Sequence, residues 1–298
     1  MPTDPGEVRT GRGVIFVNPN SGPEETSLAE LTTRFPGHRV VEMSPDDLVN
    51  AVKAAVTDAV AFVGAAGGDG TIRLVAEQLV GTDIPLLPIP AGTRNHFAKD
   101  MGIADLDASE KAADGTVIAI DVGCVNGRYF INNSSIGLYP KIVIRREAHQ
   151  RRLRKGVANV VAAYEQLREG ARVDVEIDGV THRAWMVFVG NGTYGEGLLD
   201  LADRECLNDG LLDVRVALAD RPLSRLRIVG ALFLGRLARC PLVERWQTKA
   251  TVVSLNRERV EVALDGEVET LATPLRYACV ARDLKVLVPV DTDKDREK

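Results

Sequence analysis

Residues 60–80 read V-A-F-V-G-A-A-G-G-D-G-T-I-R-L-V-A-E-Q-L-V. The apolar run from Val60 to Val63 predicts a buried strand that continues through residues 64–66, and residues 72–80 return to a helical pattern. Between them lies G-G-D-G-T, Gly67 to Thr71, where consecutive glycines let backbone N–H groups face phosphate oxygens beside an acid and a hydroxyl. The helix that follows adds its positive N-terminus. This stretch predicts an α/β fold with a phosphate-binding loop; a glycine-rich turn without a ligand is the competing interpretation.

Two other segments have the same strand-loop organisation. V-I-F-V at 14–17 predicts a strand that ends at N-P-N-S-G, residues 18–22, and the run 84–89 predicts one that ends at P-A-G-T-R-N-H-F-A, residues 90–98. Alternating strands and helices predict a parallel sheet whose polar loops meet at one edge, which favours the ligand-binding interpretation. Helices are expected to continue through Leu31, to begin at Ser44, and to run from Thr93 to Met101.

The pattern changes after Asp121 to period-two alternation with hairpin turns at Asn126-Gly127, Asp178-Gly179 and Asp265-Gly266. This predicts a C-terminal antiparallel, β-sandwich-like domain. Two helices are expected within it, one through the basic segment as far as Leu167 and one from Ser224 to Ala238. The expected division is an α/β domain at 10–122, a β-rich domain at 123–290 and a disordered tail at 291–298.

Composition excludes several classes of protein. The chain has 298 residues, 45% hydrophobic and 27% charged, which is typical of a globular protein and not of a disordered one. A net charge of −5 provides no global field for nucleic acid. Four cysteines without C-x-x-C and four histidines without H-E-x-x-H make a structural zinc site unexpected. The N-terminus lacks the features of a signal peptide, so a cytoplasmic location is expected.

The charge is unevenly distributed. Residues 141–155 contain seven basic residues and one acid, a local charge of +6. Basic residues near an anionic bilayer contribute about 1 kcal/mol each, so this segment is a candidate for transient contact with a membrane surface. Its competing interpretation is a solvated face of an amphipathic helix.

Taken together, N-P-N-S-G, G-G-D-G-T and P-A-G-T-R-N-H-F-A, followed by N-D-G-L-L-D-V at 208–214 and L-D-G-E at 264–267, resemble the diacylglycerol kinase catalytic-domain family. These bacterial lipid kinases are similar to sphingosine and ceramide kinases. The resemblance covers nearly the whole chain, and its motifs occur in the expected order. It implies a nucleotide-binding domain like those of NAD kinases and diacylglycerol kinases, an ATP-dependent kinase activity and a lipid substrate.

The resemblance also implies roles for individual residues. It makes Glu267 the general base that takes a proton from the lipid hydroxyl, and it places Asp69 near the phosphates and the metal. A bound Mg²⁺ would be held by the Asp209 carboxylate and by the backbone carbonyls of Cys206 and Leu211, which are hard oxygen ligands. The positions implied to bind ATP are Asn18, Pro19, Asn20, Ser21, Gly22, Gly67, Gly68, Gly70, Thr71, Ile72, Arg73, Thr93 and Asn95.

Two departures from the family pattern leave alternatives open. Ile72, Arg73 and Leu74 replace a polar pair beside the phosphates, and His96 stands where many relatives have an aspartate. The alternatives are an NAD kinase-like enzyme and a catalytically impaired nucleotide- or lipid-binding module. A nominal G-x-G-x-x-G at 190–195 lies in the β-rich half without a βαβ unit, so it is not expected to bind a dinucleotide. The sequence leaves a homodimer open.

Overall fold

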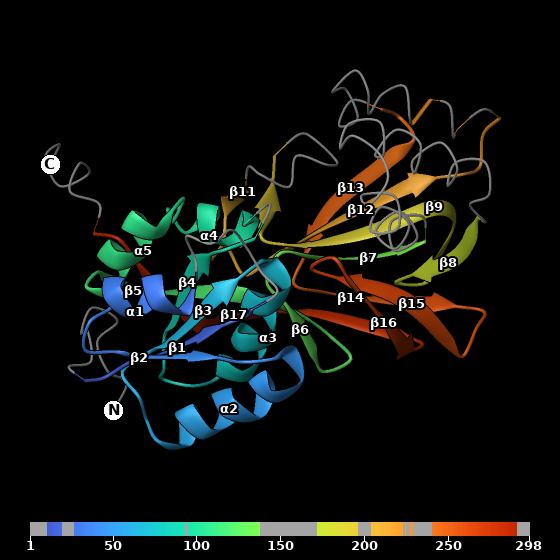
Figure 1. Cartoon of the computed structure of the whole chain (residues 1–298). Coiled ribbons are helices and arrows are strands. Elements are labelled where there is room, and N and C mark those ends of the chain that lie inside the picture. The colour runs from blue at the N-terminus through green and yellow to red at the C-terminus, as the bar shows by residue number, and fades with distance from the viewer. Residues whose placement is uncertain are drawn as a thin grey trace, which may run out of the picture. The chain divides into compact units, whose positions relative to one another are not determined.

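The computed structural model describes residues 11–19, 27–92, 95–137, 172–195, 204–222, 224, 227–228 and 240–290. The described chain forms two compact units (Figure 1). The first unit holds the residues up to Val122 together with those from Ala281 onward, and the second holds Gly123–Val280. The boundary falls within β5 (Thr116–Val125) and within β17 (Leu275–Val288).

This division differs from the expected one at its C-terminal end. The sequence analysis assigned residues 281–290 to the β-rich domain, whereas the structure places them in the first unit. The reason is a long-range pairing, because Val286 of β17 lies in parallel register with Leu86 of a strand in the first unit. Local alternation cannot show which partner a strand will find.

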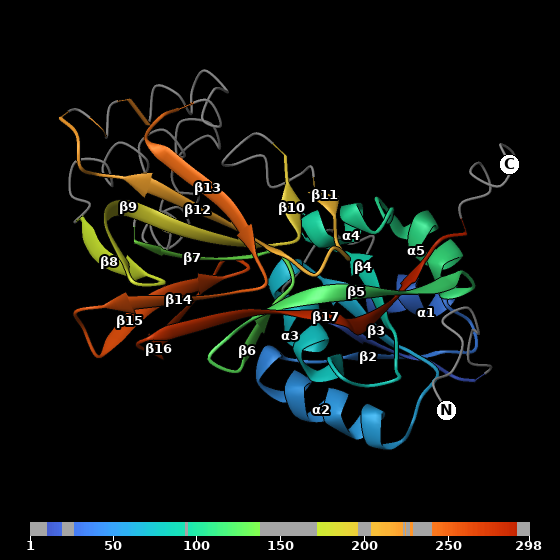
Figure 2. The same cartoon turned by 180° about the vertical axis from the view of Figure 1, so that it is seen from behind.

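The first unit is an α/β domain with a parallel sheet, as the sequence predicted. The sheet has the order β2-β1-β3-β4-β17, and its neighbouring strands are paired in parallel. Helices α2 and α3 lie on one side of the sheet and α4 and α5 on the other (Figures 1 and 2). Its elements are β1 (Val14–Val17), α1 (Leu28–Arg34), β2 (Arg39–Glu42), α2 (Pro45–Thr57), β3 (Val63–Gly67), α3 (Asp69–Leu79), β4 (Leu86–Pro90), α4 (His96–Asp100) and α5 (Leu106–Ala113).

Element boundaries follow local chemistry at some positions and tertiary packing at others. The Ser44 side chain caps α2 by accepting the Asp47 N–H, as the sequence predicted. Strand β3 begins at Val63, three residues later than expected, and includes the Gly-Ala-Ala-Gly run. A Cβ at Gly64 would lie 2.7 Å from Ile15 Cγ1, so glycine allows β1 and β3 to pack closely. Helix α4 begins only at His96, because Asn95 is left-handed with φ of 51°.

The second unit is an antiparallel β domain. Its strands follow the order β16-β15-β7-β9-β8-β14-β17, with β12 added to β9, β13 added to β12, and β6 paired with β5. Strands β10 and β11 form a separate short ribbon (Figure 2). The elements are β6 (Arg128–Phe130), β7 (Asn133–Gly137), β8 (Val173–Ile177), β9 (Val180–Asn191), β10 (Thr193–Tyr194), β11 (Arg204–Cys206), β12 (Leu212–Leu218), β13 (Val243–Thr248), β14 (Ala250–Leu255), β15 (Arg259–Leu264) and β16 (Glu267–Ala272).

The three predicted hairpin turns are confirmed. Asn126-Gly127, Asp178-Gly179 and Asp265-Gly266 each have positive φ at both central residues, the conformation that matches the twist of two-residue hairpins. The expected helix through the basic segment and the tail at 291–298 lie outside the described residues. Of the helix expected at 224–238, only Ser224, Arg227 and Ile228 are described, and they are helical.

A buried ion pair lies in the second unit. Asp213 on β12 is fully buried and accepts hydrogen bonds from Arg215 Nε at 3.1 Å and Arg215 Nη2 at 2.7 Å. Arg245 reaches the same carboxylate at 3.2 Å. Arg215 also donates to the carbonyls of Tyr194 and Gly195, so the pair connects β12 to the end of β10. Asp213 is the second aspartate of the N-D-G-L-L-D-V motif, and the motif by itself does not show that it is buried.

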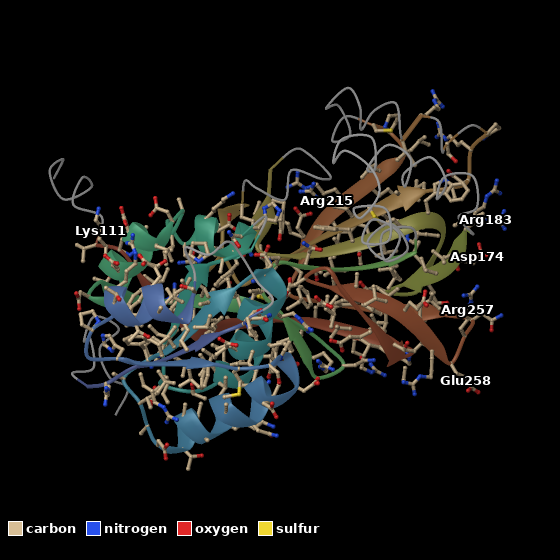
Figure 3. The ribbon with its side chains drawn as sticks, viewed as in Figure 1. Lys111, Asp174, Arg183, Arg215, Arg257 and Glu258 are labelled. Atoms are coloured by element: carbon tan, nitrogen blue, oxygen red, sulfur yellow. The ribbon has the colours of Figure 1, made fainter. Side chains whose placement is uncertain are left out.

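Replacing Asp213 with alanine is expected to lower the free energy of unfolding by about 3–5 kcal/mol, because the Arg215 charge would stay buried without its carboxylate. Asp174→Ala is the matched control, since Asp174 is exposed and pairs with exposed Arg183 on neighbouring strands (Figure 3). The control should change stability by about 0.5 kcal/mol or less. Urea denaturation measures both variants, and equal losses would contradict a buried role for Asp213.

Candidate functional site

Three loops meet at the carboxyl ends of β1, β3 and β4. The Asn18 side chain, after β1, donates from Nδ2 to Thr71 Oγ1 at 3.0 Å. The loops after β3 and β4 touch through their glycines, because a Cβ added to Gly92 would overlap the Cα of Gly68. The predicted convergence of the three polar loops is therefore present in the described residues.

The Asp69 side chain connects the loop after β3 to the first turn of α4. Its Oδ1 accepts the backbone N–H of Phe97 at 3.2 Å, and Phe97 lies in the first turn of α4. Asn95 precedes that helix but does not cap it. Its side chain instead accepts the Gly92 N–H at 2.8 Å and donates to the Gly92 carbonyl at 2.9 Å. Asp69 thus has a structural contact that the sequence did not suggest, and its placement near phosphates and metal stays a prediction.

The N-terminus of α3 provides the backbone donors of this site. Gly68 is the N-cap residue and no side chain caps the helix. The first N–H groups of a helix have no partner within it, and residues 68–70 are only half-buried. The dipole of α3 adds a partial positive charge at the same place. An anion approaching these glycines would therefore meet backbone donors and a favourable field.

Not every residue predicted to bind ATP lies at the loop surface. Ile72 is fully buried and only 3% of the surface of Arg73 is exposed, so both side chains face the core of the first unit. Arg73 Nη1 lies 3.9 Å from Glu77 Oε2, one turn along α3. The side chains of these two residues are therefore not brought to the site. Pro19 is exposed beside Asn18. Asn20, Ser21, Gly22 and Thr93 lie outside the described residues.

The three residues predicted to hold a metal gather around Gly192 in the second unit. The Leu211 carbonyl accepts the Gly192 N–H at 3.0 Å, and a Cβ at Gly192 would overlap the Cys206 carbonyl oxygen. Asp209 accepts the Leu211 N–H at 2.9 Å on one carboxylate oxygen and the Thr193 hydroxyl at 2.7 Å on the other. The loop 206–211 thus brings two carbonyl oxygens and a carboxylate into one region.

These donors fit a hard cation. Magnesium prefers oxygen ligands, and the Leu211 carbonyl and both Asp209 oxygens have lone-pair capacity beyond the one hydrogen bond described for each. The Cys206 thiol contacts the Asn208 side chain at 3.3 Å and is not needed as a ligand. Among the described residues, no group of three or more histidine, cysteine or acidic side chains is arranged to hold a metal ion. A magnesium site here would therefore depend mainly on backbone oxygens.

Glu267 is exposed at the start of β16, directly after the Asp265-Gly266 turn. The turn is fixed by Asp265, whose carboxylate accepts the backbone N–H groups of Ile131, Asn132 and Asn133 at 2.7–2.9 Å. An exposed carboxylate on an anchored turn suits a general base, because it can accept a proton while its backbone stays in place. The family resemblance implies Glu267 as the base, and that role stays a prediction, whereas the sequence pattern did not indicate the anchoring role of Asp265.

The G-x-G-x-x-G at 190–195 begins in the last two residues of β9, in the antiparallel unit. Its glycines make room for other parts of the protein. A Cβ at Gly190 would overlap the Tyr194 ring, as one at Gly192 would overlap the Cys206 carbonyl. The glycines were a correct signal of close backbone approach.

None of the helices among the described residues has the length and apolar character that a membrane span requires.

Two family models match this chain. The family model for the diacylglycerol kinase catalytic domain matches residues 12–125, and the model for a YegS C-terminal NAD kinase beta sandwich-like domain matches residues 140–288. The chain belongs to the diacylglycerol kinase catalytic-domain family. The family match makes it a kinase, and a lipid kinase in the general sense.

Individual relatives of this kinase match over different lengths. A diacylglycerol kinase of Mycobacterium tuberculosis is 30% identical over 94% of this chain and 96% of its own length. An uncharacterised protein of Synechocystis sp. is 27% identical over 77% of this chain. The match covers 55% of the length of that relative, so this chain spans about half of it. A crystal structure of a putative diacylglycerol kinase from Bacillus anthracis has a TM-score of 0.74 at 21% identity, covering 93% of this chain and 97% of that one. That structure supports the fold.

The contact between the two glycine loops can be tested by a matched pair of alanine variants. Gly92→Ala is expected to lower the free energy of unfolding by about 1–3 kcal/mol, because its Cβ overlaps the Gly68 backbone. Gly68→Ala is the control, since its Cβ would lie at an ordinary 3.6 Å from Gly92 Cα and the Gly68 backbone is extended. Thermal and chemical denaturation measure both. Similar losses in the two variants would show that the loops are not in contact as described.

Proposed function

We propose that this kinase transfers the γ-phosphate of ATP to the hydroxyl of a lipid, diacylglycerol or a related lipid. The observation that carries the proposal is the meeting of three polar loops at the uncapped N-terminus of α3. Phosphoryl transfer depends on positioning the phosphates and neutralising their charge, and it needs little covalent chemistry from the protein. Backbone donors at a helix N-terminus meet that requirement.

The first unit is assigned the nucleotide. The N–H groups at Gly68, Asp69 and Gly70 would bind phosphate oxygens, and the dipole of α3 would favour their negative charge. The Asn18 and Asn95 side chains hold the surrounding loops through Thr71 and Gly92. Asp69 holds the start of α4 by accepting the backbone N–H of Phe97. Ile72 and Arg73 would support this loop from below rather than touch ATP.

The second unit is assigned the proton transfer and the metal. Glu267 would accept the proton of the lipid hydroxyl, and the lipid oxygen would bond to the γ-phosphorus while the bond from that phosphorus to the β–γ bridging oxygen breaks and ADP leaves. When bound, Mg²⁺ would neutralise part of the negative charge around the phosphates. Asp209 would hold it with the carbonyls of Cys206 and Leu211. The Thr193 hydroxyl, which also accepts from Gln247 Nε2 at 2.7 Å, would orient the Asp209 carboxylate.

Two partner assignments remain proposals of the same kind. The acceptor is a lipid because the chain belongs to a lipid kinase family, and a mycobacterial relative is named diacylglycerol kinase. Contact with an anionic membrane surface through residues 141–155 rests on the +6 charge of that segment.

His96, at the start of α4, is half-buried beside the nucleotide loops.

The phosphate assignment predicts a variant that folds but binds ATP poorly. Gly68→Ala should keep wild-type stability, while its methyl group obstructs the approach of phosphate oxygens to the neighbouring N–H groups. The Kd for ATP is expected to rise about tenfold, equivalent to about 1.4 kcal/mol. Isothermal titration calorimetry with a nonhydrolysable ATP analogue measures it. Unchanged affinity would remove the phosphates from this loop.

The assigned base is tested by Glu267→Gln, which should lower the rate of phosphate transfer by about 10²–10⁴-fold, because glutamine cannot accept the proton. The assay follows transfer from labelled ATP to a panel of diacylglycerol, sphingoid, polyprenol and glycolipid acceptors plus NAD. Glu258→Gln is the control, since Glu258 is exposed in the loop between β14 and β15, beside Arg257 (Figure 3).

Each outcome of this assay has a distinct meaning. Lipid phosphorylation at the wild-type rate by Glu267→Gln would remove Glu267 as the base. A wild-type protein that phosphorylates NAD and no lipid would favour the NAD kinase-like alternative. A protein that binds ATP without transferring phosphate to any acceptor would be the catalytically impaired binding module.

A further inference from the structure

Residues 131–133 are a junction of hydrogen bonds in the second unit. On one side, the backbone N–H groups of Ile131, Asn132 and Asn133 all donate to the Asp265 carboxylate. The Asp265 N–H returns a bond to the Asn133 carbonyl at 2.9 Å. Four hydrogen bonds therefore connect this one turn to this one tripeptide. The turn that carries Glu267 is thereby fixed to residues 131–133.

The carbonyl side of the same segment is bound by a second set of groups. Arg204 donates from Nη1 to the Ile131 carbonyl at 2.6 Å and from Nη2 to the Asn132 side-chain oxygen at 2.9 Å. The Tyr194 hydroxyl donates to the Asn132 carbonyl at 2.7 Å. Asn191 adds a backbone bond to the Asn132 carbonyl at 2.9 Å and a side-chain bond to the Ile131 carbonyl at 3.1 Å.

Arg204 also belongs to the ribbon that leads into the loop assigned to the metal. It lies on β11 opposite Tyr194 of β10, and its guanidinium carbon lies 5.9 Å from the centre of the Tyr194 ring. Cys206 ends β11 and pairs with Thr193, whose hydroxyl donates to Asp209. Cys206, whose carbonyl is the first one assigned to the metal, is thus separated from Arg204 by one residue, Glu205.

We propose that Arg204 is a positioning residue that holds the metal loop, residues 206–211, in a fixed geometry relative to the turn that carries Glu267. The connection runs from Arg204 to residues 131–133 and from these residues to Asp265. This inference rests on the proposed function, because it acts on the base and the metal site assigned there. Arg204 touches neither substrate nor metal in this scheme.

The chemistry of the side chain explains why arginine serves here. Its planar guanidinium presents donors in a rigid fork, and the two bonds to Ile131 and Asn132 use two arms of that fork. Ile131 and Asn132 are buried, so their acceptors would lose hydrogen bonds without replacement by water. A lysine keeps the charge, but its three N–H donors lie on a single nitrogen, so it should not reproduce both contacts.

The test uses Arg204→Met, Arg204→Lys and the control Arg183→Met, which removes an exposed arginine of the same unit (Figure 3). Supporting residues around a metal site typically change affinity or activity by about 10- to 100-fold. We therefore expect kcat for lipid phosphorylation to fall about tenfold or more in both Arg204 variants, with KM for ATP within about twofold of wild type. Arg183→Met should match wild type.

A double-mutant cycle separates positioning from general destabilisation. If Arg204 acts through the geometry of the base, Arg204→Lys should lower kcat far less in a Glu267→Gln background than in the wild type. The same fold-loss in both backgrounds would overturn the inference. So would a wild-type kcat in both Arg204 variants. If Arg204→Met does not fold, the lysine variant alone decides the cycle.

A second readout needs neither ATP nor lipid. The thermal midpoint of the full chain is measured during a titration with MgCl₂ alone. Wild type and Arg183→Met should gain stability with the same half-saturation, while Arg204→Lys should need about tenfold more Mg²⁺ and Asp209→Asn should lose the response. An identical response in Arg204→Lys and wild type, or no response in wild type, would overturn the inference. Absence of lipid phosphorylation with the expected Mg²⁺ pattern would instead refute the proposed function.

Discussion

The loops of this protein are held in place by aspartate carboxylates that accept backbone N–H groups. Asp69 accepts the N–H of Phe97, Asp209 that of Leu211, and Asp213 that of Tyr194. Asp265 accepts three such groups from residues 131–133. Loop N–H groups cannot join a sheet or helix ladder, and leaving them buried without an acceptor costs free energy. A short carboxylate provides two acceptor atoms from a single position, so it can fix a loop without a regular element.

This arrangement has a consequence for the chemistry. In the proposed scheme, two acids take part directly: the Asp209 carboxylate binds the metal and the Glu267 carboxylate accepts the proton. Asp213 is buried with Arg215 and Arg245, and Asp265 is committed to the turn. Asp69 lies between these cases, because it is half-buried and one oxygen binds α4. An acidic residue in a family motif can therefore serve the backbone of the site rather than the reaction.

Much of the fold followed from local sequence patterns. Strand β1 and the capped start of α2 lie where the pattern placed them, and all three two-residue turns adopt positive φ. These features depend on neighbouring residues, since Asn-Gly and Asp-Gly tolerate left-handed backbone and serine caps its own helix. Elements that depend on distant partners were less predictable. Strand β2, residues 39–42, reads R-V-V-E and has no fully buried residue, so it lacks the apolar run that marked β1. The last part of β17 joins the first unit by pairing with β4.

The residue types around the candidate site can be read from local motifs: three glycine- and asparagine-rich loops, the acids of N-D-G-L-L-D-V, and the glutamate after Asp265-Gly266. The local role of each residue depends on contacts that form when the chain folds. Folding buries Ile72 and Arg73 in the core of the first unit, and it brings the Asp69 carboxylate to the Phe97 N–H at the start of α4. It also connects Arg204 to Asp265 through residues 131–133. The physical reason is that turn and helix propensities act over a few residues, whereas the partner of a carboxylate or a guanidinium is set by segments that meet only when the chain has folded.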